Sequence, residues 1–216
     1  MDILFIGNSF TYYNEMPEIL NSLSAAACAD IHAERLTYGG YYLTWYTDPE
    51  NPHGNEAVPL IESRHFDHIV LQEQSAAPAI ENEVFSEGVS KLMPHIKASG
   101  ARPVFYKTWA YGRESAKLSD IGMGYEEMLF RLTAAYDAEA EKNGAGAVPV
   151  GERFFRLMED HPVLDLYKED AYHPNLCGSY LAACLFFKYF TGQNPPDSWL
   201  PERLDPGYAK ILRGYV

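Results

Sequence analysis

The chain has 216 residues, of which 47% are hydrophobic, 14% aromatic and 22% charged, and its formal net charge is -13. This composition is typical of one globular domain spanning residues 1–216 and excludes an intrinsically disordered chain. The negative charge argues against binding to nucleic acid or to an anionic membrane surface, because both require clustered Lys and Arg side chains. A neutral or cationic small-molecule substrate is the better expectation.

Apolar runs and chain-breaking residues alternate along the whole sequence. Short apolar runs predict buried strands at residues 3–6, 31–37, 68–71, 103–107 and 147–150. Helical spacing predicts helices at residues 14–28, 56–63, 82–98, 125–143 and from 174 or 175 to 190. Residues 41–54 hold several aromatic, Pro and Gly residues, and we expect them to form a long loop.

This alternation of strands and helices predicts an α/β fold. Right-handed crossovers between the strands would give a five-stranded parallel sheet covered by helices on both faces, which is a three-layer α/β/α sandwich. Ligands of such sheets bind at the carboxyl ends of the strands. We therefore expect one crevice to collect the residues that follow the predicted strands, namely Ser9, Gly39, Gly40, Gln74 and Trp109.

Two motifs at opposite ends of the chain could form a catalytic triad. The first predicted strand runs into Gly-Asn-Ser at residues 7–9, and Asp-Ala-Tyr-His-Pro occupies residues 170–174. A serine hydroxyl becomes a nucleophile when a histidine accepts its proton and a carboxylate fixes the tautomer of that histidine. Ser9 alone would fit a helix cap or a turn better than a nucleophile. With the pair downstream, we expect Ser9 to be the nucleophile, His173 the base and Asp170 the residue that orients His173.

The motifs resemble those of the SGNH (GDSL-like) hydrolase superfamily, which contains esterases, lipases and carbohydrate deacetylases. The resemblance spans nearly the whole chain. The sequences at residues 7–11, 71–75 and 173–175 are similar to those of a poorly characterised bacterial branch of the superfamily. It implies a flavodoxin-like topology and gives Ser9, Asp170 and His173 the roles proposed above. It also implies hydrolysis of small ester bonds, with acetylated carbohydrate as the favoured substrate.

The resemblance further implies an oxyanion hole with three hydrogen-bond donors. Two of them would be the N–H of Ser9 and the N–H of Gly39 or Gly40. The third donor in the family is an asparagine in a Gly-x-Asn-Asp block, but this chain has Gln-Glu-Gln-Ser at residues 72–75. Gln74 can donate the same hydrogen bond from one methylene further out, and Gln72 is the competing candidate. We interpret Glu73 as a solvated charge rather than a catalytic acid.

Five residues are candidates for contact with the substrate: Asn8, Gln72, Tyr41, Trp45 and Trp109. Aromatic rings with polar tips can offer flat faces to a sugar, although packing back onto the fold is an equal alternative for them. A thioesterase, a lipase or an acyltransferase could use the same triad. The chain could also belong to a different class, a non-catalytic glycan-binding module. In that case the altered sequence at residues 72–75 would reflect the loss of the oxyanion hole.

No cofactor is expected. The His and Cys residues show no metal-ligand spacing, so no metal site is expected either. The odd number of cysteines, Cys28, Cys177 and Cys184, favours reduced thiols. The sequence has no signal-peptide pattern and no apolar run of transmembrane length, which predicts a cytoplasmic protein. Removal of a signal peptide from a secreted or periplasmic protein would leave the same sequence, and the oligomeric state stays open.

Overall fold

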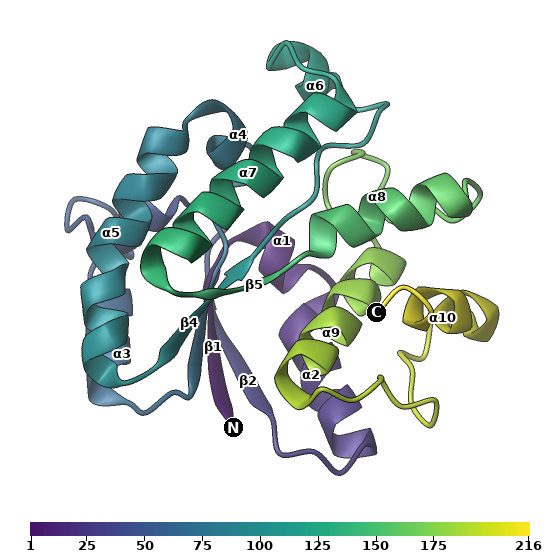
Figure 1. Ribbon diagram of the computed structural model, residues 1–216, viewed down its shortest axis with the longest axis horizontal. Coiled ribbons are helices and arrows are strands. Elements are labelled where there is room, and N and C mark those ends of the chain that lie inside the picture. The colour runs from purple at the N-terminus through teal and green to yellow at the C-terminus, as the bar shows by residue number, and fades with distance from the viewer.

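The computed structural model describes residues 1–216 and contains one five-stranded sheet (Figure 1). The strand order is β2-β1-β3-β4-β5, and all four neighbouring pairs are parallel. This is the flavodoxin-like order, so the predicted fold class is confirmed. The strands are β1 (Asp2–Gly7), β2 (His32–Thr37), β3 (His68–Leu71), β4 (Arg102–Tyr106) and β5 (Gly146–Val148).

Helices and two short 3-10 segments connect and follow these strands. The 3-10 segments are η1 (Tyr13–Glu15) and η2 (Leu43–Thr47). The helices are α1 (Ser9–Tyr12), α2 (Met16–Ala26), α3 (Ala57–Ser63), α4 (Ala77–Ile80), α5 (Asn82–Ser99), α6 (Ala116–Asp120), α7 (Tyr125–Asn143), α8 (Val150–Asp160), α9 (Leu176–Thr191) and α10 (Pro206–Arg213).

The sheet has a hydrophobic core on each face, because successive side chains of a strand point to opposite sides. In β1, Ile3 and Phe5 belong to the core that also contains buried residues of α2 and α9. Leu4 and Ile6 belong to the core that contains residues of α3 and α5. Figure 1 shows α3, α5 and α7 on one side of the sheet and α2 and α9 on the other. The result is the expected three-layer sandwich.

Two helices of eight or more residues, α8 and α10, were not predicted from the sequence, and neither were the short helices α1, α4 and α6. The apolar run at 147–150 was interpreted as a strand, but β5 ends at Val148 and α8 already begins at Val150. Val150, Phe154 and Leu157 lie one to two helical turns apart and are buried, so a signal of helical period was present. The second missed helix, α10, begins at Pro206 after Asp205, whose carboxylate caps the N–H of Tyr208.

The predicted site residues follow the C-terminal ends of the strands and therefore lie at one edge of the sheet. Ser9 follows β1, Gly39 follows β2, Gln74 follows β3 and Trp109 follows β4. Because all the strands are parallel, these positions lie at the same carboxyl edge. None of the helices combines the length and the apolar character that crossing a bilayer requires. The three cysteines are free thiols.

Candidate active site

Ser9 is the first residue of α1, directly after the turn that leaves β1. Asn8 precedes it as the helix N-cap, and its side-chain oxygen accepts a hydrogen bond from the Phe10 N–H at 3.1 Å. The Asn8 amide donates to the backbone oxygen of Tyr41 at 3.1 Å. Asn8 is only 2% exposed. Its side chain holds the turn that presents Ser9, and this burial argues against its expected contact with substrate.

Gln72 supports the same turn from β3. Its Oε1 accepts hydrogen bonds from the Asn8 N–H at 2.8 Å and from the Thr11 hydroxyl at 3.0 Å, and its Nε2 donates to the backbone oxygen of Glu73. A side chain at Gly7 would collide with this amide, since an added Cβ would lie 2.5 Å from Oε1. Gln72 is 1% exposed and its Nε2 is already bonded to the Glu73 oxygen, which argues against its expected roles as a substrate contact and as the alternative oxyanion donor.

Ser9, His173 and Asp170 form one hydrogen-bonded chain. The Ser9 hydroxyl lies 2.9 Å from Nε2 of His173, and Nδ1 of His173 lies 2.8 Å from Oδ2 of Asp170. The other carboxylate oxygen of Asp170 accepts hydrogen bonds from the backbone N–H groups of Tyr172 and His173, at 3.1 and 2.9 Å. The structure thus brings together the three residues that the sequence predicts as a triad. Their catalytic roles remain a prediction.

The electrostatics of this chain suit proton transfer from serine. Burial lowers the pKa of His173 below its ordinary value of 6.5, against the effect of the Asp170 carboxylate. Burial opposes ionisation of Asp170, but hydrogen bonds from the imidazole and from two backbone N–H groups outweigh it and hold the pKa of Asp170 below its ordinary value. At neutral pH the pair is therefore a neutral imidazole beside a carboxylate, which is the state of a general base.

The expected oxyanion donors lie on the segments that follow β1 and β2. The N–H of Ser9 is at the start of α1, where helix N–H groups have no intrahelical acceptor. Gly39 and Gly40 form an exposed turn closed by the Tyr41 N–H on the Tyr38 oxygen at 3.2 Å, with Gly40 at a φ of +69°. The turn lies beside the nucleophile helix, because a Cβ at Gly39 would lie 3.2 Å from the Tyr12 hydroxyl.

Gln74 has a fixed side-chain orientation. Its Oε1 accepts hydrogen bonds from the N–H groups of Ala76 and Ala77, at 2.9 and 3.1 Å. The amide nitrogen Nε2 is consequently the donating end of the group, and it faces the Tyr111 hydroxyl. Gln74 is partly exposed, in contrast to Gln72. No hydrogen bond joins Gln74 to the triad, so its role as third oxyanion donor stays a prediction.

Glu73 corrects one interpretation of the sequence. It is not a solvated charge, because it is fully buried. Its Oε1 accepts hydrogen bonds from the Leu43 N–H at 3.0 Å and from the Gln74 N–H at 2.6 Å, whereas Oε2 has no partner. Burial raises the pKa of Glu73 to about 8, with a smaller contribution from Glu81. The carboxyl group therefore ties the 41–47 segment to the end of β3 as a mostly neutral acid.

We expect the stability of the protein to fall as the pH rises from about 4.5 to about 8 because of Glu73. Over this range the unfolded chain loses the Glu73 proton while the folded protein retains it, a difference on the order of 3 to 5 kcal/mol. The Glu73→Gln variant keeps the accepting oxygen without the ionisation. Thermal unfolding should show that its melting temperature relative to wild type is higher at pH 9 than at pH 4.

An exposed carboxylate provides the control for this measurement. Glu83 lies in the first turn of α5 and is exposed, so Glu83→Gln should change the melting temperature by the same small amount at both pH values. If the difference between Glu73→Gln and wild type were equally independent of pH, the pKa of Glu73 would be the same in the folded and the unfolded protein, and the raised pKa assigned to Glu73 would be wrong.

The predicted aromatic residues contribute less exposed surface than expected. Trp109 is fully buried between the rings of Phe10 and Phe154, at 4.6 and 4.4 Å, and its indole N–H donates to the Tyr172 oxygen at 3.0 Å. This burial argues against its predicted contact with substrate, and the indole supports the segment that carries His173. Tyr41 is 8% exposed and also packs inward. Trp45, at 36% exposed, retains a free surface.

Two tyrosines that the sequence analysis did not select contact the imidazole directly. The Tyr13 ring stacks on His173 with centres 4.2 Å apart, and the Tyr172 ring lies 4.1 Å from it. Tyr172 stands between the two motif residues Asp170 and His173, and Tyr13 follows the nucleophile helix at once. Their proximity in sequence to the motif residues was the only signal that could have identified them.

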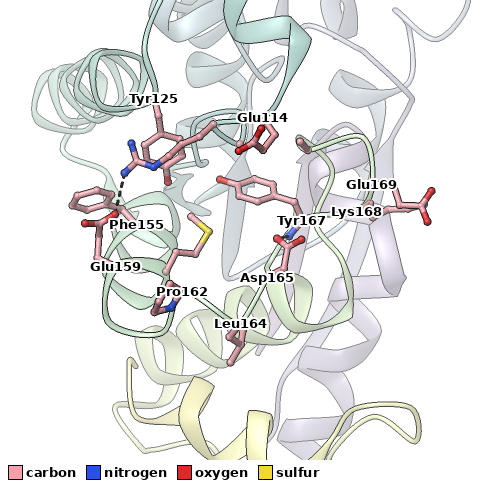
Figure 2. Close-up of a pocket in the computed structure, with 14 residues that line it drawn as sticks. Glu114, Tyr125, Phe155, Glu159, Pro162, Leu164, Asp165, Tyr167, Lys168 and Glu169 are labelled. Atoms are coloured by element: carbon pink, nitrogen blue, oxygen red, sulfur yellow. Dashed lines mark hydrogen bonds and ion pairs between the residues drawn. The ribbon is translucent and has the colours of Figure 1, made fainter.

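A cavity of about 580 Å³ lies behind the segment that carries the triad acid (Figure 2). Its lining includes Ala171, Lys168 and Tyr167 from that segment, with Tyr125 of α7 and Phe155 of α8 on the opposite wall. Ser9 and His173 do not line it. No group of three or more His, Cys, Asp or Glu side chains is arranged to hold a metal ion.

Parallel strands in flavodoxin order, with a hydrogen-bonded Ser-His-Asp chain at their carboxyl edge, are an arrangement typical of α/β/α hydrolases. A candidate SGNH hydrolase from Slackia heliotrinireducens is 32% identical in sequence, with a TM-score of 0.76, and the match covers 88% of this chain and 98% of that one. The chain belongs to the SGNH hydrolase family.

More distant solved structures share the fold. A DUF4886 family protein from Bacteroides uniformis has a TM-score of 0.84 at 20% identity, covering 100% of this chain and 92% of that one. An acetyl xylan esterase, AlAXEase, has a TM-score of 0.66 at 10% identity, covering 88% of this chain and 99% of that one. No protein-family model and no curated protein matches the sequence.

Proposed function

We propose that this SGNH hydrolase is a serine esterase that removes acetyl groups from carbohydrate. The hydrogen-bonded chain from Ser9 through His173 to Asp170 is the observation that carries the proposal. Its distances are those of a nucleophile beside its general base, already aligned without substrate. The acetyl xylan esterase of the same fold and the partly exposed aromatic ring of Trp45 favour an acetylated sugar among small esters.

The reaction follows from the polarity of these groups. Oγ of Ser9 attacks the acetyl carbonyl carbon while Nε2 of His173 takes the hydroxyl proton, and Asp170 stabilises the imidazolium that forms. His173 then gives the proton to the sugar oxygen as the carbon–oxygen bond breaks, leaving an acetyl-serine. Water, deprotonated by His173, attacks this ester and releases acetate. The developing oxyanion would be bound by the N–H groups of Ser9 and Gly39 or Gly40 and by Gln74.

Covalent labelling tests the assignment of the nucleophile. A fluorophosphonate should add once to the wild-type protein, and peptide mass analysis should place the adduct on Ser9. The exposed Ser119 of α6 provides the matched control, because Ser119→Ala should label normally whereas Ser9→Ala should not. An unlabelled wild-type protein would instead support a non-catalytic glycan-binding module.

A substrate panel tests the acyl group and the alcohol. We expect kcat/KM to be higher for p-nitrophenyl acetate than for the butyrate and octanoate esters, and we expect release of acetate from acetylated xylose units. A preference for the octanoate or for thioesters would favour a lipase or thioesterase activity with the same triad. Transfer of acetyl to added sugar in place of water would favour an acyltransferase.

We expect the Gln74→Ala variant to lose about a hundred- to a thousand-fold in kcat, as is typical when one oxyanion donor is removed. KM should change little, because the bond forms mainly to the charged transition state. Steady-state kinetics on p-nitrophenyl acetate measures both constants. Since Oε1 of Gln74 also caps α4, the melting temperature should be measured in parallel.

The Gln74→Glu variant separates the two roles of this residue. A glutamate keeps the oxygen that caps α4 but has no N–H to donate, so it should restore stability and leave kcat low. A kcat close to the wild-type value in both variants would show that Gln74 is not an oxyanion donor.

A further inference from the structure

Tyr111 is a buried tyrosine near the triad that the reaction described above does not use. It lies five residues beyond the end of β4 and is 3% exposed. Its hydroxyl is 2.7 Å from Oγ of Ser75, the residue that follows Gln74. The same hydroxyl faces Nε2 of Gln74. Because a phenol oxygen can accept one hydrogen bond while it donates another, Tyr111 can bond to both residues at once.

The backbone on either side of Tyr111 is tied to the segment that carries the triad acid. The oxygen of Ala110 accepts a hydrogen bond from the Tyr167 hydroxyl at 2.8 Å. The N–H of Gly112 donates to the oxygen of Ala171, the residue after the triad acid, at 2.6 Å. A Cβ at Gly112 would lie 3.0 Å from that same oxygen, so the two segments are in close contact. These contacts fix where Tyr111 stands relative to the triad.

The ring of Tyr111 also reaches the side of the base. It meets the Tyr172 ring edge to face, with centres 5.7 Å apart, and the Tyr172 ring centre lies 4.1 Å from that of His173. Tyr111 therefore contacts the acid–base segment through its ring and its neighbours in the chain. Its hydroxyl contacts the segment that contains the expected oxyanion donor.

The geometry of Gln74 explains why a contact at its nitrogen matters. Oε1 is held by the N–H groups of Ala76 and Ala77, so Nε2 forms the opposite end of the amide. An amide nitrogen has two N–H groups, and one can be donated to a phenol while the other is donated elsewhere. An oxyanion donor is effective when its direction is fixed before the charge develops.

We propose that Tyr111 is a positioning residue, whose hydroxyl accepts one N–H of Gln74 and thereby directs the second N–H at the oxyanion. This inference rests on the proposed esterase activity, with Gln74 as third donor. It explains how a glutamine, with one more rotatable bond than the asparagine of the family, can be held in one orientation. Burial raises the pKa of Tyr111 above its ordinary value of 10.0, so the phenol stays neutral at the pH of the reaction.

The Tyr111→Phe variant tests the proposal, because it removes the hydroxyl and keeps the ring against Tyr172. We expect kcat for p-nitrophenyl acetate to fall by about three- to ten-fold, the effect of losing one neutral hydrogen bond. KM should change little, since Gln74 would act mainly on the transition state. The melting temperature, measured in parallel, shows whether the variant is folded.

Two further variants accompany this measurement. Ser75→Ala removes the other partner of the phenol and should lower kcat in the same direction by a smaller factor. Tyr106→Phe is the matched control, since Tyr106 at the end of β4 is also buried but its hydroxyl has no hydrogen-bond partner. It should keep the wild-type kcat.

A double-mutant cycle distinguishes positioning from a merely structural role. In the Gln74→Ala background no amide remains to be oriented, so adding Tyr111→Phe should change kcat by less than about two-fold. If Tyr111 instead acted by supporting the acid–base segment, the same three- to ten-fold loss would appear in both backgrounds. If Tyr111→Phe did not fold, Ser75→Ala in the two backgrounds would provide the same comparison.

The outcomes separate this inference from the proposed function. Wild-type kcat in folded Tyr111→Phe, or an equal loss with and without Gln74, would overturn the inference and leave the triad unaffected. Wild-type kcat in Gln74→Ala would overturn both the donor role of Gln74 and the inference. Failure of the wild-type protein to hydrolyse any ester would overturn the proposed function itself.

Discussion

Replacing Ser9 by alanine should lower kcat by about a million-fold, because the nucleophile and its base act as one unit. The His173→Ala variant should lose about as much, since the Ser9 hydroxyl 2.9 Å from Nε2 then has no proton acceptor. The double variant should be no worse than either single one. Initial rates with p-nitrophenyl acetate, corrected for hydrolysis in buffer, measure all three.

Folding controls are needed for this comparison. Ser9 is 9% exposed and its hydroxyl donates one hydrogen bond, to Nε2 of His173, so Ser9→Ala should unfold at nearly the wild-type temperature. Ser119→Ala on α6 should retain full activity. Appreciable turnover by a folded, purified Ser9→Ala protein would show that another group is the nucleophile, and losses that multiplied in the double variant would show that Ser9 and His173 act independently.

The triad residues could be predicted because each lies at a position that the topology fixes. A serine that follows the first strand and a His-Pro pair that starts the last long helix are local patterns, and the parallel sheet brings them to one edge. Gln72 and Gln74 could not be separated in this way. They lie two residues apart at the end of one strand, and only the burial of Gln72 under the Ser9 turn distinguishes them.

Burial also explains why the surroundings of Glu73 and Trp109 differ from those expected. Glu73 was expected in solvent because carboxylates are seldom buried. Hydrogen bonds from the N–H groups of Leu43 and Gln74 reduce the free-energy cost of burying its carboxyl group. Trp109 follows a strand just as the site residues do, but stacking between Phe10 and Phe154 turns it into the core. Contacts between segments that are distant in the sequence produce no periodic pattern of residues, so burial of this kind could not be predicted from the sequence.

The Asp170→Asn variant should lose about ten thousand-fold in kcat while His173 and Ser9 stay in place. If the amide nitrogen of the new asparagine faces His173, its N–H donates to Nδ1, so Nδ1 becomes the acceptor. The ring proton then sits on Nε2, which cannot take a proton from Ser9. The opposite orientation would direct the amide N–H groups at the backbone N–H groups of Tyr172 and His173. Either arrangement disables the base.

Asp165 provides a control in the same segment. Its carboxylate also accepts a backbone N–H two residues on, from Tyr167 at 2.9 Å, but it does not touch the imidazole. Asp165→Asn should therefore keep kcat within a few-fold of wild type. Kinetics with p-nitrophenyl acetate should place the two variants about three orders of magnitude or more apart. Equal, small losses in both would mean that Asp170 only shapes the turn and that His173 keeps its tautomer without a carboxylate.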